Sequence, residues 1–226
     1  MNAHLILLHE TYEALDHHAM QRHWQEVRAP WVARLPSVRR YAQDIVLAQS
    51  DGRRDWFGVE EFWTDDAPDA LDLLSTLSVP GANELAKRES GNRTRQVCLL
   101  VTDHVVLAGA PIARSELLPK RMTFLRRNSG LSHDEMLHYW RHLHGPLAAS
   151  VPGVRRYVQS PVIDMPCGTG PKPPIEGVAQ IWIDDEAALQ AIVASELFRR
   201  RVKPDEANFV DTDLTFTLSV HEQRVL

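Results

Sequence analysis

The chain has 226 residues, 44% of them hydrophobic and 24% charged, which is typical of a globular protein with room for two domains of about 110 residues. Its net charge of −5 argues against a protein that binds nucleic-acid phosphates, because such a protein needs clustered positive charge. We therefore expect no nucleic-acid partner. No apolar run approaches about 20 residues, so we also expect no membrane span.

Two further features of the sequence bear on the cellular compartment of the protein. Cys98 and Cys167 stand at unrelated positions in different halves of the chain, which suggests unpaired thiols in a reducing compartment and predicts a cytoplasmic protein. The opening MNAHLILLHE has no basic stretch and only a short apolar run, so it predicts a first strand and not a signal peptide.

In chain order, the first half predicts the element order β-α-β-β-α-β. One helix is expected at residues 16–34 and a second within residues 68–88, interrupted near Pro80-Gly81. The Asp51-Gly52 pair predicts a tight hairpin turn between the second and third strands. The predicted strands are LILLH (5–9), SVRRYAQDIVL (37–47), WFGVEEFW (56–63) and RQVCLLVTDHVV (95–106), and residues 109–119 are the expected linker.

The second half predicts the same order. Ser132 and Glu135 form an S-x-x-E capping box that begins a helix, Gly145-Pro146 breaks or kinks it, and Pro152-Gly153 ends it. Residues 164–177, rich in Gly and Pro, predict a loop, and residues 184–202 predict a second helix. The predicted strands are RMTFLRR (121–127), VRRYVQSPVI (154–163), GVAQIWID (177–184) and DLTFTLSV (213–220).

The two halves indicate an internal duplication. RHWQEVRAPWVARLPSVRRYAQ, residues 22–43, aligns without a gap with HYWRHLHGPLAASVPGVRRYVQ, residues 138–159, so that a Trp, two Pro and an identical VRRY coincide. GVEEFWTDD, residues 58–66, likewise matches GVAQIWIDD, residues 177–185. The three extra residues of the second copy fall in its long loop.

The repeated order is that of the ferredoxin-like split βαβ unit. Helices cover one face of such a sheet, and two copies can bury their open faces together. We therefore expect an α+β fold of two tandem ferredoxin-like βαββαβ repeats, residues 1–108 and 120–226, forming a pseudo-dimeric α+β barrel. Such a chain can be a monomer, as its own pseudo-dimer, or form a homodimer.

The stretch YWRHLHGPLAASVPGVRRYVQ, residues 139–159, resembles the signature helix and second strand of the EthD family, which belongs to the dimeric α+β barrel group. Family members are similar to small proteins found beside ether-degrading oxidases, and to enzymes that isomerise, cyclise, dehydrate or oxidise aromatic and polyketide-like molecules without an external cofactor. The resemblance implies a small hydrophobic or aromatic substrate and no cofactor. The first half departs from the motif, with His23, Arg28, Ala29 and Ser37 in place of Tyr139, His144, Gly145 and Gly153.

His144 is the first candidate for catalysis. An imidazole suits proton transfer near neutral pH, and the adjacent Gly145 has no side chain that would block access to it. The alternative is that His144 caps the end of the helix by bonding a free carbonyl. The resemblance favours the catalytic role.

Tyr139 and Tyr157 are the expected catalytic partners, because a tyrosine hydroxyl can donate a hydrogen bond to a developing enolate or phenolate oxygen. Packing is the alternative role for these aromatic residues. Asp164, at the base of the 164–177 loop, could orient an imidazole or act as a base, and the loop is either a lid or a surface insertion. The residues expected to bind substrate are Trp140, Asp164, His23, Arg28 and Tyr41.

No metal site is expected. His138 and His142 stand four residues apart on one helix face, but the sequence offers no third ligand at a fixed spacing, so a solvent-facing pair is the favoured interpretation. The chain also has no G-x-S-x-G elbow and no glycine-rich phosphate loop that opens a helix.

Together with these residues, the EthD resemblance implies a cofactor-independent enzyme, an isomerase, dehydratase or other lyase. Such an enzyme would act by general acid/base catalysis on an aromatic or unsaturated carbonyl compound in catabolism or secondary metabolism. A cofactor-free monooxygenase is the alternative within enzymes. A non-catalytic accessory or binding protein for a hydrophobic metabolite is the alternative outside them.

Overall fold

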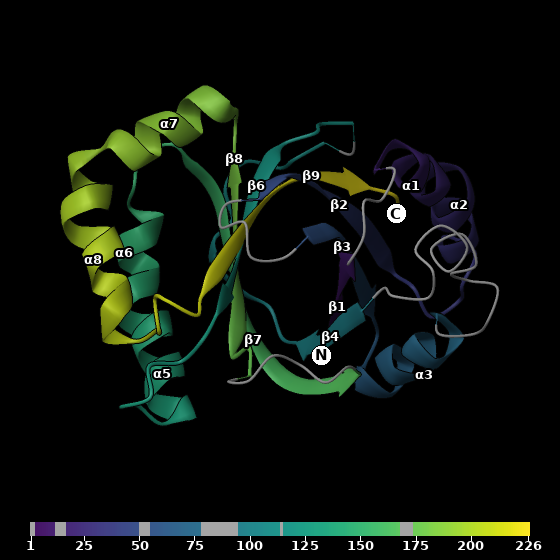
Figure 1. Ribbon diagram of the computed structural model, residues 1–226, viewed down its shortest axis with the longest axis horizontal. Helices are drawn as coiled ribbons and strands as arrows, with labels where there is room; N and C mark the ends of the chain where they lie inside the picture. The colour runs from purple at the N-terminus through teal and green to yellow at the C-terminus, as the bar shows by residue number, and fades with distance from the viewer. Residues whose placement is uncertain (1–2, 12–16, 50–54, 78–94, 114, 168–173) are drawn as a thin grey trace. The chain divides into compact units, whose positions relative to one another are not determined.

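The computed structural model describes residues 3–11, 17–49, 55–77, 95–113, 115–167 and 174–226 (Figure 1). The chain divides into two compact units. Unit one comprises Met1–Thr102, Ile163–Gly170 and Glu222–Leu226, and unit two comprises Asp103–Val162 and Pro171–His221.

Unit one is an antiparallel sheet with helices. Its strands are β1 (Ala3–Thr11), β2 (Arg40–Gln49), β3 (Asp55–Thr64) and β4 (Arg95–Val101), in the order β4-β1-β3-β2. Its helical segments are α1 (His17–His23), the π-helical turn η1 (Trp24–Arg28), α2 (Ala29–Val32) and α3 (Ala67–Leu77). Apolar side chains of one sheet face and of the helices form the core: Leu5 pairs with Phe62, whose ring stacks on Tyr41, and Leu73 of α3 packs against them.

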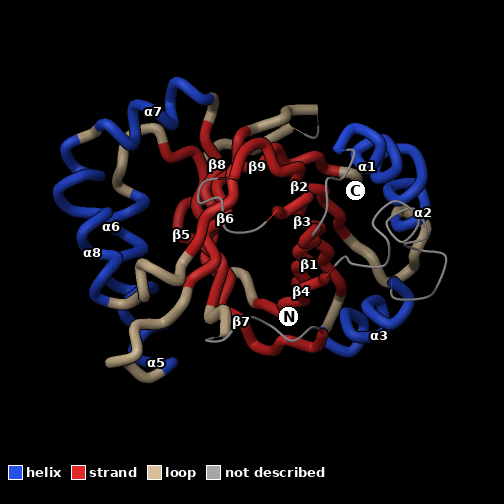
Figure 2. Tube along the Cα trace, viewed as in Figure 1, coloured by secondary structure: helices blue, strands red, loops and turns tan. Residues whose placement is uncertain are grey.

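Unit two repeats this strand order and adds one edge strand. Its strands are β5 (His104–Leu107), β6 (Pro119–Leu125), β7 (Val154–Cys167), β8 (Gly177–Ile183) and β9 (Phe216–Arg224), in the order β9-β6-β8-β7-β5. Its helical segments are α5 (His133–Tyr139), π-helical η2 (Trp140–His144), α6 (Gly145–Ala149), α7 (Glu186–Ala194), π-helical η3 (Phe198–Val202), α8 (Lys203–Asp205) and the short 3-10 turn η4 (Glu206–Asn208). These helices cover one face of the sheet (Figure 2).

Several predicted boundaries were wrong. The strand predicted at 95–106 is two strands, β4 and β5, and β5 belongs to unit two. The loop predicted at 164–177 begins later, because β7 continues to Cys167. The helix predicted at 184–202 is broken at Ser195, where the backbone is extended. The predicted Pro80-Gly81 interruption and the Asp51-Gly52 turn lie outside the described residues.

The prediction of an unpaired thiol at Cys98 was also wrong, and the side chain of Cys167 lies outside what the structure describes. Cys98 is buried in β4 and takes part in a disulfide bond. The argument from free thiols to a reducing compartment therefore loses its basis, and a cytoplasmic location stays a prediction. Among the described helices, none has the length and apolar character that crossing a bilayer requires.

Proline explains the three π-helical turns. Each ends immediately before an X-Pro pair, and the residue before the proline donates its N–H to the carbonyl five residues back. Proline has no N–H, and its ring would clash with the carbonyl four residues earlier, so the helix widens by one residue at that point. The donor and acceptor pairs are Ala29 to Trp24, Gly145 to Trp140, and Lys203 to Phe198.

The motif residues shared by both halves form the same contacts in each unit. In unit two, the Gln159 amide donates to the Trp140 carbonyl at 2.8 Å and to the Tyr157 hydroxyl at 3.2 Å. The Trp140 ring lies against Gly177 of β8, where a Cβ atom would come within 2.5 Å of it. The corresponding contacts in unit one join Gln43 to Trp24 at 3.1 Å and to Tyr41 at 2.8 Å, with Gly58 against the Trp24 ring.

Gly177 is therefore expected to be required for this packing. Gly177→Ala should lower the free energy of unfolding by about 1–3 kcal/mol, since the new methyl group overlaps a fully buried indole. Denaturant unfolding followed by tryptophan fluorescence measures the change. Gly130→Ala is the matched control, because the nearest atom to its Cβ position is at 3.5 Å, an ordinary contact. Equal stability of the two variants would show that Trp140 can move at no cost.

Candidate active site

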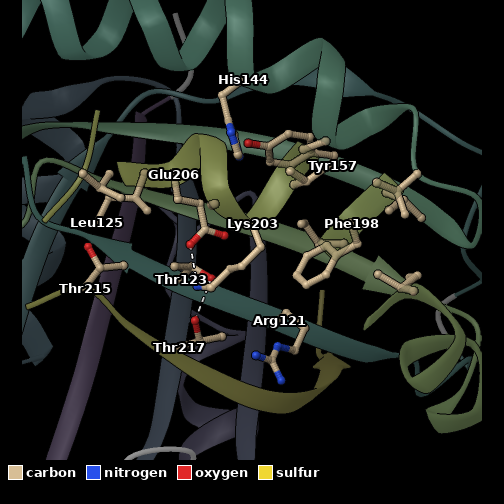
Figure 3. Close-up of a pocket in the computed structure, with 18 of the residues that line it drawn as sticks. Arg121, Thr123, Leu125, His144, Tyr157, Phe198, Lys203, Glu206, Thr215 and Thr217 are labelled. Atoms are coloured by element: carbon tan, nitrogen blue, oxygen red, sulfur yellow. Dashed lines mark hydrogen bonds and ion pairs between the residues drawn. The ribbon is translucent and has the colours of Figure 1, made fainter. Parts of the chain in front are cut away.

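A cavity of about 190 Å³ lies between the sheet and the helices of unit two (Figure 3). Alternate residues of β6 face it, because successive side chains of a strand point to opposite faces: Arg121, Thr123 and Leu125. The volume is below the roughly 300–1,000 Å³ of sites for drug-sized ligands, so the cavity fits a small molecule. Apolar side chains from the helical side include Leu189, Ile192, Phe198, Val202 and Phe209.

Helix α5 and the turn after it place His144 on this cavity. The predicted capping box is present, with the Ser132 N–H donating to Glu135 at 2.7 Å and the Glu135 N–H donating to Ser132 at 3.2 Å. The π-helical turn η2 then brings Trp140 and His144, four residues apart, to the same buried side. Both residues line the cavity.

Asp205 holds the His144 ring. Its carboxylate lies 2.9 Å from His144 Nδ1, and it also accepts hydrogen bonds from the Tyr139 hydroxyl at 2.7 Å and the Asn208 amide at 3.1 Å. Burial raises the pKa of Asp205, but these three hydrogen bonds outweigh burial and hold that pKa below its usual range. The ionised carboxylate can only accept, so Nδ1 carries the hydrogen, and in the neutral imidazole Nε2 then presents a lone pair.

Tyr157 supplies a hydrogen-bond donor beside the imidazole. Its hydroxyl oxygen accepts from Trp140 Nε1 at 2.9 Å and from Gln159 Nε2 at 3.2 Å, and its own hydrogen has no acceptor among the residues that the structure describes. Burial raises the pKa of Tyr157 to about 12, so the hydroxyl stays protonated at neutral pH. Figure 3 shows the hydroxyl and the His144 ring together at one side of the cavity.

The other residues predicted in this unit have different positions. Tyr139 donates its hydroxyl to Asp205 and stacks on Phe209, with ring centroids 5.6 Å apart, and it does not line the cavity. It is placed to orient Asp205, not to touch substrate. Asp164 is exposed near the end of β7, accepts the Met165 N–H at 2.7 Å and is not among the lining residues.

In unit one, two of the predicted binding residues are engaged in a buried network that we call the unit-one ion cluster: His9, Arg28, Tyr41 and Glu60. Arg28 makes two hydrogen bonds of 2.9 Å to the Glu60 carboxylate, which also accepts from Tyr41 and lies 3.0 Å from His9. His23 is half-buried at the end of α1. Glu60 aligns with Ala179, which lines the cavity of unit two, so the two units differ in chemistry at this place.

Two groups of side chains in the described residues bring possible metal ligands close together. His138 and His142 are exposed with ring centroids 4.7 Å apart, and within the described ranges no third ligand joins them. Asp44, Glu61 and Glu222 are buried with carboxylate oxygens within 4.8 Å of one another. His4 lies 3.2 Å from Glu61 and Arg224 lies 2.5 Å from Glu222, so basic side chains of the protein already face two of these carboxylates.

Sequence reasoning missed Asp205, Asn208 and Arg121. Asp205 and Asn208 lie some 60 residues after His144, between a predicted helix and a predicted strand, where no spacing connects them to the motif. Arg121 lies in a predicted strand, but the sequence does not show which face of that strand lines a cavity. The only available signal was the alternation of Arg121, Thr123 and Leu125 along that strand.

The site lies within a stretch that matches a known family. Residues 128–213 match the model of the EthD domain. This stretch is an EthD domain. It contains His144, Tyr157 and Asp205, and the resemblance read from residues 139–159 is confirmed there. The match does not extend to the first half, where an EthD repeat stays a prediction.

No curated protein matches the sequence, but solved structures resemble the chain that carries this EthD domain. An anthrone oxidase-like protein matches with 11% identity and a TM-score of 0.66 over 99% of this chain and 93% of its own. A proposed monooxygenase from Fusobacterium nucleatum matches with 5% identity and 0.60, over 98% and 92%. Another from Lactobacillus acidophilus matches with 9% identity and 0.57, over 99% and 95%. At these identities the likeness shows the fold alone, the dimeric α+β barrel fold.

Proposed function

We propose that the chain is a small-molecule enzyme in which His144 acts as a general base on an aromatic or unsaturated carbonyl compound. One observation carries the proposal: His144, oriented by Asp205, lines the cavity beside the Tyr157 hydroxyl. A cavity lined only by apolar side chains would instead have favoured a binding or accessory protein. The imidazole and the hydroxyl together support proton transfer.

In the proposed reaction, Nε2 of His144 takes a proton from a carbon next to the carbonyl. Tyr157 donates a hydrogen bond to the oxygen that becomes negatively charged, while Trp140 and Gln159 fix the position of that hydroxyl. The imidazolium formed is stabilised by ionised Asp205. Returning the proton to a different carbon completes an isomerisation, and giving it to a departing hydroxide releases water and completes a dehydration.

A cofactor-free monooxygenase is the second candidate, and the fold shared with an anthrone oxidase-like protein and two proposed monooxygenases favours it. Its first step is the same, since a phenolate or enolate must form before it can react with dioxygen. One oxygen atom would then enter the product in place of two hydrogens, which leave with the other oxygen atom as water.

One experiment separates these functions. Aromatic ketones, phenols and unsaturated lactones are incubated with the protein in deuterated buffer, with carbon-bound exchange followed by NMR and dioxygen followed with an electrode. Exchange without dioxygen uptake supports an isomerase or lyase, and uptake matched to product supports a monooxygenase. If compounds that bind in the cavity show neither, the protein is a binding protein and the catalytic proposal is wrong.

Tyr157→Phe should lower kcat by about 10²–10³, because one donor to the developing oxyanion is lost. It should also lower the free energy of unfolding by about 1–3 kcal/mol, since the Trp140 and Gln159 donors lose their buried acceptor. Steady-state kinetics and denaturant unfolding measure the two effects. Val220→Ala, at a fully buried residue outside the cavity, controls for stability and should keep kcat near wild type. Equal kcat for Tyr157→Phe and wild type would remove Tyr157 from the mechanism.

We also propose that the chain consists of two tandem ferredoxin-like repeats, residues 1–108 and 120–226. Two observations support this: the strand order β4-β1-β3-β2 returns as β9-β6-β8-β7, and the Trp–Tyr–Gln contacts recur in both units. A monomeric or homodimeric state remains a proposal from the sequence. A cytoplasmic location stays a proposal too, without the support of free thiols.

A further inference from the structure

Arg121 occupies a defined place on the sheet wall of the cavity. It pairs with Ile181 of β8 on one side and with Ser219 of β9 on the other. Because side chains two residues apart share a face of a strand, its guanidinium stands on the same face as Thr123. In Figure 3, Arg121 and Thr123 come from the sheet, whereas His144 comes from the opposite, helical side.

The charge of Arg121 is not matched by a carboxylate in direct contact. Among the described residues its guanidinium donates one hydrogen bond, to the neutral Ser219 hydroxyl at 3.0 Å, and forms no ion pair with a carboxylate. Glu186 attracts it only from a distance, and the Glu186 carboxylate accepts from Gln190 at 2.8 Å. The other lining cation, Lys203, is paired with Glu206 at 2.6 Å.

An anionic ligand would complete this arrangement. A guanidinium has five N–H donors in a planar fork, and a carboxylate accepts two of them in parallel. Partial burial makes an unpaired cation unfavourable, which is why the pKa of Arg121 is lowered, and a bound anion would remove that cost. Thr123 and Thr217, whose hydroxyl oxygens are 2.9 Å apart, add polar groups to the same wall.

We propose that Arg121 binds a carboxylate group of the substrate, which makes the substrate an aromatic or unsaturated carboxylic acid. The inference rests on the proposed function in placing the substrate in this cavity. Arg121 on the sheet wall fixes the acid group, and His144 on the helical wall meets the carbon that loses its proton. Arg121 is thus the residue that selects acids over neutral analogues.

Paired probes test this inference by binding alone. Dissociation constants are measured by calorimetry for benzoate, phenylacetate and cinnamate, and for their carboxamides, which have nearly the same shape without the charge. Wild type should bind at least one acid about tenfold or more tighter than its amide, because charge-assisted bidentate bonds are the strong ones. Arg121→Gln should reduce that preference to less than about twofold with the amide affinity unchanged, and Arg121→Lys should retain part of it.

Arg200→Gln is the matched control, since it removes the same charge from an exposed residue outside the cavity and should keep the preference. A panel in which wild type prefers no acid, or in which Arg121→Gln keeps the preference, overturns the inference. If wild type turns over neutral carbonyl compounds but shows no preference for acids, the inference about Arg121 is wrong and the proposed function still holds. If wild type and His144→Ala both prefer acids but wild type turns over no substrate, the proposed function is wrong and the inference about Arg121 still holds.

Discussion

Replacing His144 with alanine is expected to lower kcat/KM by about 10²–10⁴, the range that a positioned general acid or base contributes. The imidazole is the group whose free nitrogen faces the cavity, and the Tyr157 hydroxyl stays protonated and cannot replace it as a base. Steady-state kinetics on any substrate found by the exchange screen measures the loss. Dissociation constants for that substrate should change little, because the proton transfer and not the binding is removed.

Asp205→Asn tests whether Asp205 sets the tautomer of the His144 ring. An amide at this position can donate to Nδ1, which favours the ring tautomer with its hydrogen on Nε2 and removes the lone pair from the cavity side. Activity should fall nearly as far as in His144→Ala. His142→Ala is the matched control, an exposed histidine in the same turn that does not line the cavity. Activity of His144→Ala within threefold of wild type would exclude His144 as the base.

The largest effect on stability is expected from Arg28 in the unit-one ion cluster. Arg28→Met should lower the free energy of unfolding by about 3–5 kcal/mol, because it leaves the fully buried Glu60 carboxylate without its main partner. Urea unfolding at pH 7, followed by tryptophan fluorescence, measures the loss. The double variant Arg28→Met/Glu60→Gln should recover most of it, since no charge then remains unpaired.

The unit-one ion cluster also predicts how the loss of stability in Arg28→Met depends on pH. Burial raises the pKa of Glu60, but Arg28 and His9 outweigh burial and hold that pKa well below its usual range. Glu60 therefore binds fewer protons in the folded than in the unfolded state, and its contribution is present above the ordinary carboxyl pKa of about 4.3 and is lost as the pH falls below it. In Arg28→Met the pKa of Glu60 rises, so the carboxyl can protonate and the deficit should be smaller at pH 5 than at pH 7.

Arg39→Met is the matched control for this experiment. Arg39 makes a similar bidentate pair with Asp65, but both side chains are about half exposed, so water replaces the lost partner. Its unfolding midpoint should stay close to that of wild type at both pH values. If Arg28→Met unfolds like Arg39→Met, the buried cluster contributes no more than a surface pair.

The local features of the fold could be predicted because their causes lie within a few residues. The Ser132–Glu135 box begins α5 as expected, since both hydrogen bonds join residues three apart. Pro146 changes the helix before it because it lacks an N–H. The separation of β4 from β5 was missed, because nothing in RQVCLLVTDHVV marks which strand each part pairs with.

By itself, the sequence determined the repeated element order, the EthD resemblance of residues 139–159, and His144 and Tyr157 as candidates. Only the tertiary structure decided that Asp205 holds His144, that Tyr139 orients Asp205, and that Arg28 and Tyr41 bond a buried Glu60. The physical reason is distance along the chain. Capping and helix-breaking follow from the identity of near neighbours, whereas the partner of a buried polar group is set by how remote elements pack, which no spacing within one motif records.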